Sequence, residues 1–541
     1  MVSPSRRYEM KNLRRIAVLV LAVTVLFCGG RAVPARGDAT GAVPASAGKD
    51  ISAKTKRVIR PGEIKFSSEF GRIIETYDGG GDKLIVHIQD AHTNYEAQKN
   101  AADILEELIN KYGLYLILVE GGSRDVSLNH YRENAPLETR KQNADKALRE
   151  GIIAGEEYLN IASDYPMKLQ GIEDRGVYDQ NMVAFLGVDK GKDEALAYIK
   201  TIAGFINVLK PRIYTKEAKE LDDMRVGFKA ATVGLADYTR YLDDTTRQRK
   251  IDLGAYPNFK KLMDTTRIEK EIDFTLVEKE RAEVIDLLSK KMDQAAMGEM
   301  LTRSVDFKAG KLTPAQYHNY LKDVIADNKA DLKKYPNLEK YIRYIAVYES
   351  LDSAALFKEL KNIQEKVEQA LVTDEEAKRF LRISKDVEFL EGFINLQLSP
   401  DDFEYYKQNE GNFNIPAWAR FVNSQAAKYK LNRTVPDDTG AIDKVMPSVR
   451  DFYTVARKRD DIFMNNAKKY MDAEGVNFAV LIAGGFHTPP LTKLFQDNKI
   501  SYLVVSPKVL KQTDEKLYHK ILTEGWAPQS EAAPAAQPEN Q

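Results

Sequence analysis

The segment from Lys83 to Gly122 constrains the fold more than any other part of the chain. It contains two short apolar runs, Leu84–Ile88 and Leu114–Val119, and between them a polar segment whose apolar residues recur at helical spacing. A strand, a helix and a second strand in this order form the unit from which parallel sheets are built. We therefore predict an α/β fold whose ligand crevice lies at the carboxyl ends of the strands.

Charged residues or histidines follow four predicted strands at their carboxyl ends. The third and fourth of these strands are predicted at Met167–Ile172 and Phe478–Ala483. Because the carboxyl ends of parallel strands meet at one edge of a sheet, we expect these side chains to lie close together. The residues are Asp90, His92, Glu120, Glu173, Asp174, Arg175 and His487.

This set of side chains favours hydrolytic chemistry. Two histidines and a carboxylate can hold a zinc, manganese or cobalt ion with positions open for water, and the predicted ligands are His92, Glu120 and His487. A metal-bound water can attack an acyl or peptide carbonyl, with Glu173 or Asp90 as base or as support for the ligands. Without a metal, a histidine paired with a carboxylate can act as a general base.

Each of these residues also has a structural interpretation. Glu120 precedes Gly-Gly and can cap the next helix, and His487 can hydrogen-bond within its own turn. His87 lies within a predicted strand and is expected in the core, whereas His318 and His519 lie in charged helical surroundings and are expected at the surface. The functional interpretation therefore depends on four strand ends meeting.

Residues 181–442 have a different pattern, with apolar residues at helical spacing and no predicted strand. Within them, residues 228–262 resemble residues 307–341 without a gap, so that DLGAYPNFKK recurs as DLKKYPNLEK. A duplicated helical unit accounts for this repeat, and stacked helices can present a surface to a protein partner. We therefore predict a mostly parallel sheet domain with helices on both faces, formed by residues 66–180 and 443–520 and split by a large all-helical insertion that contains an internal repeat.

The N-terminus has the layout of an export signal. Basic residues precede the apolar run Ile16–Cys28, and small residues follow it. We expect a signal peptide at residues 1–35, a linker at 36–65, a disordered tail at 527–541, and a periplasmic or extracellular location. The alternative is an uncleaved segment that anchors the protein in a membrane through residues 16–28.

Composition excludes several classes of site. Lysine plus arginine equals aspartate plus glutamate, at 80 each, so the net charge gives no reason to expect nucleic acid as a partner. The single cysteine, Cys28, excludes an intrachain disulfide and a cysteine-based zinc site.

The motif Gly484-Gly485-Phe486-His487, together with His92 in a strand-end turn and Glu120 after a second strand, resembles the TraB/TIKI/PrgY and erythromycin-esterase/ChaN-like superfamily. That superfamily pairs two Gly-x-x-His motifs with a glutamate and an arginine, and often carries a helical insertion. The resemblance covers residues 66–180 and 443–510. The first motif departs from the pattern, because Gln89 holds the glycine position. Arg459-Asp460 loosely matches the family's arginine–asparagine pair, which implies that Arg459 stabilises charge.

The resemblance implies functions that range from metal-dependent proteolysis to ester hydrolysis and haem binding, so the fold does not fix the reaction. The first hypothesis is an exported metal-dependent hydrolase of peptide or ester bonds, in which Arg175 or Arg459 stabilises the oxyanion. The second is a non-catalytic envelope protein that binds haem or another ligand and engages a partner through the helical repeats. A purely structural envelope protein is a third, and it predicts no cavity at the strand ends.

Overall fold

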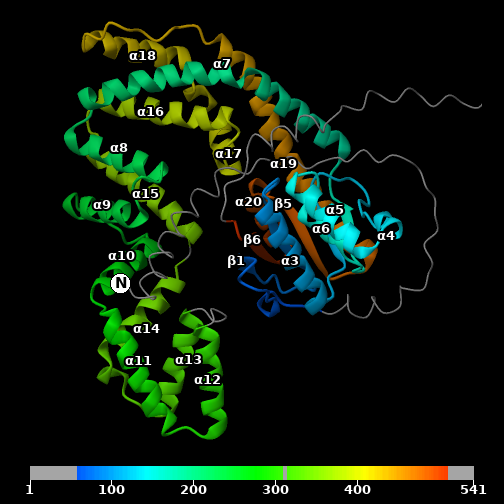
Figure 1. The fold of residues 1–541 in the computed structure, drawn as a ribbon. Coiled ribbons are helices and arrows are strands. Elements are labelled where there is room, and N and C mark those ends of the chain that lie inside the picture. The colour runs from blue at the N-terminus through cyan, green and yellow to red at the C-terminus, as the bar shows by residue number, and fades with distance from the viewer. Residues whose placement is uncertain (1–57, 309–313, 352, 510–541) are drawn as a thin grey trace, which may run out of the picture. The chain divides into compact units, whose positions relative to one another are not determined.

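The computed structural model describes residues 58–308, 314–351 and 353–509 (Figure 1). The predicted signal peptide, most of the predicted linker and the predicted tail lie outside these residues. Within the described part of the chain, no helix has the length and apolar character needed to cross a membrane.

The described residues form two compact units. The first, the sheet unit, comprises residues 58–203, 386–423 and 434–509. The second, the helical unit, comprises the described residues of 204–385 together with 424–433.

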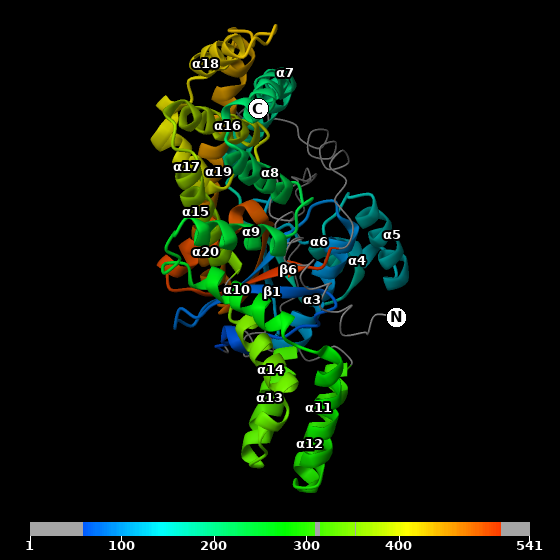
Figure 2. The same cartoon turned by 90° about the vertical axis from the view of Figure 1, so that its left-hand side faces the viewer.

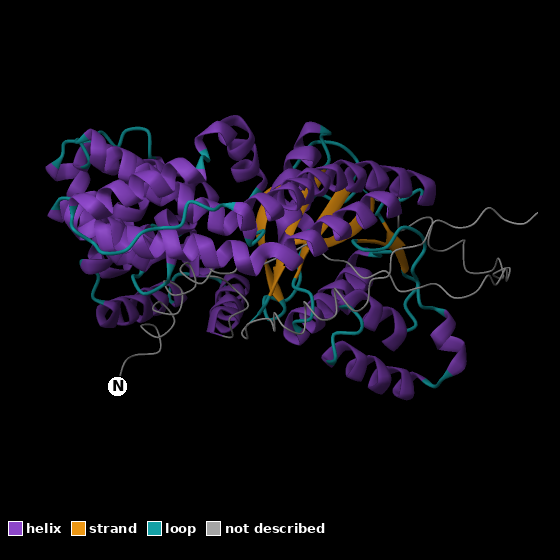
Figure 3. Cartoon of the chain, turned by 90° about the horizontal axis from the view of Figure 1, so that it is seen from above, coloured by secondary structure: helices purple, strands orange, loops and turns teal. Residues whose placement is uncertain are grey.

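The sheet unit contains one sheet of six strands in the order β1-β6-β2-β5-β3-β4. Figure 3 shows the sheet in orange among the helices. Strands β2 to β6 pair parallel with one another, which confirms the prediction of a mostly parallel sheet. β1 lies at the edge, where it pairs antiparallel with β6 rather than forming a hairpin with β2. The strands are β1 (Gly71–Tyr77), β2 (Leu84–Asp90), β3 (Leu116–Val119), β4 (Lys168–Gly171), β5 (Phe478–Gly484) and β6 (Ser501–Pro507).

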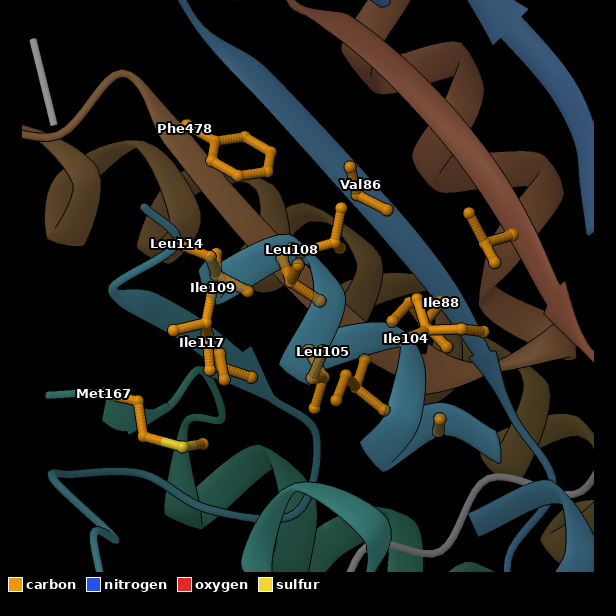
Figure 4. Close-up of a cluster of buried hydrophobic side chains, with 14 of the residues drawn as sticks. Val86, Ile88, Ile104, Leu105, Leu108, Ile109, Leu114, Ile117, Met167 and Phe478 are labelled. Atoms are coloured by element: carbon orange, nitrogen blue, oxygen red, sulfur yellow. The ribbon is translucent and has the colours of Figure 1, made fainter. Parts of the chain in front are cut away.

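One face of the sheet is covered by helices α3 (Tyr95–Tyr112) and α6 (Gly155–Ala162). The N-cap Asn94 of α3 accepts a hydrogen bond from the Ala97 N–H, and Gly113 ends the helix at a φ of 72°. Figure 4 shows the apolar side chains of α3 packed against β2, β3 and β5. Ile59 and Ile64, which the sequence places in the linker, are buried in this same core.

The other face is covered by α19 (Gly440–Glu474) and α20 (Thr488–Asp497). Phe463 and Met471 of α19 and Phe495 of α20 pack with the strand residues that point to this side of the sheet. Helices therefore cover both faces, as predicted.

The remaining short elements of the sheet unit lie around this core. They are η1 (Pro61–Glu63), α4 (His130–Asn134), α5 (Leu137–Arg149), α17 (Pro400–Asn409), η3 (Glu410–Asn412) and η4 (Gly485–His487). Three helices include residues of both units, namely α7 (Arg175–Ile213), α16 (Glu375–Ile394) and α18 (Ile415–Lys428).

The helical unit contains no strand among its described residues. In it α13 lies beside α12 and α14, and α14 also lies beside α11 (Figure 2). Its helices are α8 (Lys216–Lys229), α9 (Leu235–Gln248), α10 (Pro257–Lys270), α11 (Phe274–Ser289), α12 (Gln294–Lys308), α13 (Pro314–Asp327), η2 (Leu332–Lys334), α14 (Pro336–Glu349) and α15 (Ser353–Leu371).

The expectation that His318 lies at the surface is wrong. Its ring is fully buried and meets the rings of Phe307, Tyr317 and Tyr341 edge-on, with centroids 4.9–5.4 Å apart. The surrounding charged residues misled the prediction, because they occupy the other sides of an amphipathic helix.

Candidate functional site

The carboxyl end of β2 carries the first histidine–aspartate pair. His92 Nδ1 lies 2.5 Å from Asp90 Oδ2, and the His92 side chain is 16% exposed while Asp90 is buried. The next residue, Thr93, has a φ of 60°, which is uncommon for a β-branched residue. Such backbone strain is typical of functional loops, and here it lies in the turn that directs His92.

The carboxyl end of β5 carries the second pair. His487 ends the short helix η4, and its Nδ1 lies 2.5 Å from Asp460 Oδ1 on α19. Both side chains are buried. His487 Nε2 lies 3.4 Å from Glu120 Oε1, so His487 lies between Asp460 and Glu120.

Glu120 follows β3 and reaches across to β5. Its Oε2 accepts a hydrogen bond of 2.8 Å from the Gly484 N–H, and its Oε1 lies 2.7 Å from Arg459 Nη2. Gly121 has a φ of 86°, which favours glycine, and the turn thereby aims Glu120 into the sheet end. Glu120 therefore does not cap the following segment.

Arg459 is the centre of the buried charges. Its Nη2 and Nε lie 2.5 Å and 3.2 Å from the two carboxylate oxygens of Glu173, and its Nη1 donates to Asn181 Oδ1 at 2.9 Å. The arginine side chain is only 1% exposed. One guanidinium therefore joins the ends of β3 and β4 to α7 and α19.

The environment shifts the pKa values of these groups in different directions. Burial lowers the pKa of His92, but the charge of Asp90 and the hydrogen bond to it outweigh burial and raise that pKa from 6.5 to about 9. Burial raises the pKa of Glu120, but His487 and Arg459 hold it well below its usual range. Burial raises the pKa of Glu173 and of Asp460 in spite of their cationic neighbours.

The histidine expected in the core is there. His87 is fully buried; its Nε2 lies 2.9 Å from Thr488 Oγ1 and its Nδ1 lies 3.2 Å from the Leu481 carbonyl oxygen. Burial lowers its pKa to about 4, so His87 is neutral at physiological pH.

Gln89, the departure from the glycine of the family motif, lies inside β2 opposite Ala483. Its side chain donates to Thr488 Oγ1 at 3.2 Å. The backbone turn that directs His92 comes later, at Thr93, so Gln89 occupies an ordinary strand position in which a side chain is accommodated.

The structure brings His92, Glu120, Glu173, Arg459 and His487 to the expected sheet edge, together with Asp90. Arg175 instead pairs with Asp179, at 3.1 Å, in the first turn of α7. Asp174 caps that helix through the Val177 N–H.

Asp460 was named only as the neighbour of Arg459 in the family match, and Asn181 and Gln98 were missed as members of the site. Asp460 and Asn181 lie within helices and Gln98 lies in α3, so no strand-end pattern marks them. The adjacency of Asp460 to Arg459 was the one available signal.

The predicted metal ligands do not form a metal-binding group as they lie here. Among the described residues, no three His, Cys, Asp or Glu side chains are placed to hold a metal ion. Glu120 instead binds Arg459 and the Gly484 N–H, so the Arg459 guanidinium takes the position beside Glu120 that a metal ion would need. The metal centre therefore stays a prediction, and so does haem binding.

Comparison of the chain with protein family models, with curated proteins and with solved structures gave no match. The superfamily resemblance therefore stays a prediction, and the proposals below rest on the geometry of the site.

A pH-dependent stability is expected from Glu156 in the first turn of α6. Its side chain is buried with Oε2 lacking a hydrogen-bond partner, and burial and the charge of Asp90 raise its pKa from 4.5 to about 8. Because the pKa of this carboxyl is higher in the folded state than in the unfolded state, the folded protein loses stability as pH rises from about 4.5 to about 8. Relative to wild type, Glu156→Gln should gain stability over this window, with a Tm difference of roughly 2–4 °C per kcal/mol. Thermal unfolding at pH 5, 7 and 9 measures this, with the exposed Glu69→Gln as control. A Tm difference independent of pH would contradict it.

Proposed function

We propose that the sheet unit is an exported hydrolase of ester or amide bonds, with its site at the carboxyl ends of β2, β3 and β5. The observation that carries this proposal is the presence of two histidine–aspartate pairs, His92–Asp90 and His487–Asp460, at the ends of two adjacent parallel strands with Glu120 beside them. A histidine oriented by a carboxylate is the usual means of moving a proton to or from a reacting group.

His92 is the group assigned to the substrate, because its side chain is 16% exposed. Its Nε2, the nitrogen that faces away from Asp90, is buried, so the substrate or the attacking water has to reach this atom past the side chains around it. In its neutral form His92 takes a proton from water, and the water oxygen bonds to the substrate's carbonyl carbon. Asp90 holds the ring and stabilises the imidazolium that forms. The imidazolium then returns the proton to the leaving oxygen or nitrogen as its bond to carbon breaks, so the products are an acid and an alcohol or amine.

The other charged side chains hold this arrangement in place. Arg459 directs its donors at Glu120, Glu173 and Asn181, so its role is to fix the two carboxylates rather than to touch an oxyanion. Both oxygens of Glu173 contact Arg459, which makes Glu173 a partner of the arginine rather than a base. His487 and the Gly484 N–H fix Glu120 from the β5 side.

A metal-dependent form of this hydrolase would require Glu120 to exchange Arg459 for the ion. A bound metal would supply an activated water. The roles given above to His92 and Asp90 do not require it.

A substrate panel tests the proposal. The purified protein is assayed against chromogenic esters, amides and peptides, as prepared, after chelation, and after addition of Zn²⁺, Mn²⁺ or Co²⁺. Hydrolysis of one class of substrate is expected, and retention of activity after chelation would favour the metal-free route. Absence of hydrolysis in every arm, together with retention of haem, would favour the binding protein instead.

We also propose that the helical unit arose by duplication and presents a surface to a protein partner. Helices α9 and α10 have the same lengths as α13 and α14, 14 residues each. Phe228 stacks on Tyr238 at 4.6 Å, and at the matching positions Phe307 stacks on Tyr317 at 4.4 Å.

Two glutamates beyond the repeated ranges, Glu280 and Glu359, support this duplication, because they are 79 residues apart, the same offset as Phe228 and Phe307. Glu359 of α15 accepts from the Phe259 N–H at 2.8 Å and from the Asn258 side chain at the start of α10. Glu280 of α11 accepts in the same way from the Leu338 N–H at 2.7 Å at the start of α14. The segment that follows each copy of the repeat therefore caps a helix of the other copy.

Removing either glutamate should destabilise the helical unit. Glu359→Ala leaves a buried N–H and a buried amide without their acceptor, at an expected cost of about 1–3 kcal/mol. Glu280→Ala should act in the same direction with a smaller effect, because its contacts are less buried. Thermal unfolding measures both, with Glu375→Ala as control because that side chain is 87% exposed. Equal Tm values for Glu359→Ala and the control would contradict the mutual capping.

A further inference from the structure

We propose that Gln98 is the positioning residue of the His92–Asp90 pair: its side-chain amide, anchored at the start of α6, holds Asp90 so that one carboxylate oxygen is directed at His92. The proposal rests on the proposed function of this site. Gln98 lies on α3 and is buried, with 3% exposure.

The amide of Gln98 makes three hydrogen bonds. Its Nε2 donates to Asp90 Oδ1 at 2.5 Å and to the Ala91 carbonyl oxygen at 3.1 Å. Its Oε1 accepts from the Gly155 N–H at 2.7 Å. Oδ1 of Asp90 is thereby occupied, and Oδ2 lies 2.5 Å from His92 Nδ1.

These partners leave only one orientation for the amide. Turning it over would place Oε1 against Asp90 Oδ1 and the Ala91 carbonyl oxygen, which are both acceptors, and Nε2 against the Gly155 N–H, which is a donor. Gln98 therefore presents a hydrogen-bond donor to Asp90 Oδ1 and cannot present an acceptor there.

The start of α6 is held close to α3 at this point. A Cβ atom on Gly155 would lie only 2.2 Å from the backbone oxygen of Gln98, so the approach requires glycine. The position of Gln98 is therefore set by the packing of two helices, outside the loop that carries His92. This separates Gln98 from the groups that touch the substrate.

Two substitutions at Gln98 remove its hydrogen-bond donor while keeping a side chain of similar length. Gln98→Glu replaces the donating nitrogen by an oxygen that faces Asp90, and Gln98→Met removes the donor without adding charge. Gln170→Glu is the control, because Gln170 is similarly buried in the same unit and its side-chain amide donates to the Gly171 carbonyl oxygen rather than to Asp90. Asp90→Asn/Gln98→Glu reverses donor and acceptor between residues 90 and 98 and should restore part of the alignment of residue 90 toward His92, because the new carboxylate oxygen still faces the Ala91 carbonyl oxygen.

Two readouts separate positioning from general damage. For Gln98→Glu and Gln98→Met we expect kcat to fall about 10–100-fold with little change in KM, as for other partners that orient a reacting group, while Gln170→Glu keeps kcat. The kcat of the double variant should exceed the value expected if the losses of the two single variants simply multiplied. At fixed pH, the ¹⁵N signals of the His92 ring, assigned by their loss in His92→Ala, should shift in both Gln98 variants and not in Gln170→Glu.

The ring signals need no substrate, so the two proposals can fail separately. If the wild type hydrolyses nothing but the His92 signals shift, the hydrolase proposal fails and the positioning stands. Unchanged His92 signals in folded Gln98→Met, or an equal loss of kcat in Gln170→Glu, would overturn the role of Gln98.

Discussion

Arg459→Leu should destabilise the sheet unit by about 3–5 kcal/mol, the usual cost of removing one partner from a buried ion cluster. The side chain is 1% exposed and holds the carboxylates of Glu120 and Glu173, each 2% exposed. Without the guanidinium, both carboxylates remain buried and lose their main cation. Denaturant unfolding followed by circular dichroism measures the effect.

Two further variants separate charge from geometry. Arg459→Lys should recover only part of the stability, because one ammonium group cannot reach three acceptors in the directions of the guanidinium. Arg175→Leu is the control, because Arg175 makes a partly exposed ion pair with Asp179 and lies over the Tyr178 ring, both within its own helix. If Arg459→Leu unfolds at the same denaturant concentration as Arg175→Leu, the buried charge cluster does not stabilise the fold.

The second large effect is expected at the first histidine–aspartate pair. His92→Ala should lower kcat by about 10²–10⁴-fold, the contribution typical of a general base. Asp90→Asn keeps the size of the side chain but presents an amide that no longer stabilises the imidazolium, so a loss of similar order is expected. Steady-state kinetics on the hydrolysed substrate measure both losses.

His130→Ala is the matched control for these kinetics. His130 lies in the same unit, in α4, where it is exposed and its ring packs against Tyr131 with centroids 4.3 Å apart. Full activity in His92→Ala, or an equal loss in His130→Ala, would assign the reaction to other side chains.

Strands β2 and β5 were predictable because each is a short apolar run that ends in a polar group, at Leu84–Ile88 and Phe478–Ala483. The partner of β1 was not predictable, because pairing with β6 joins residues more than 400 positions apart and no local pattern specifies it. Ile59 and Ile64 were assigned to a linker, because isolated apolar residues carry no period.

Of the site, the strand-end residues could be predicted and the helical residues could not. His92, Glu120, Glu173 and His487 share the edge that parallel topology requires. Asp460 and Asn181 enter from helices, and their directions depend on how those helices pack on the sheet. Gln89, which holds the glycine position of the family motif, lies in strand β2, whereas the turn that directs His92 comes at Thr93.

The measurement that tests the central claim most directly is the pH dependence of kcat/KM for wild type and Asp90→Asn. A base whose pKa is raised to about 9 gives a rate that increases with pH and levels off above about 9. In Asp90→Asn the break should move to lower pH and the plateau should fall. A wild-type profile that breaks near 6.5, and that Asp90→Asn leaves unchanged, would contradict the assignment of His92 and Asp90 as the catalytic pair.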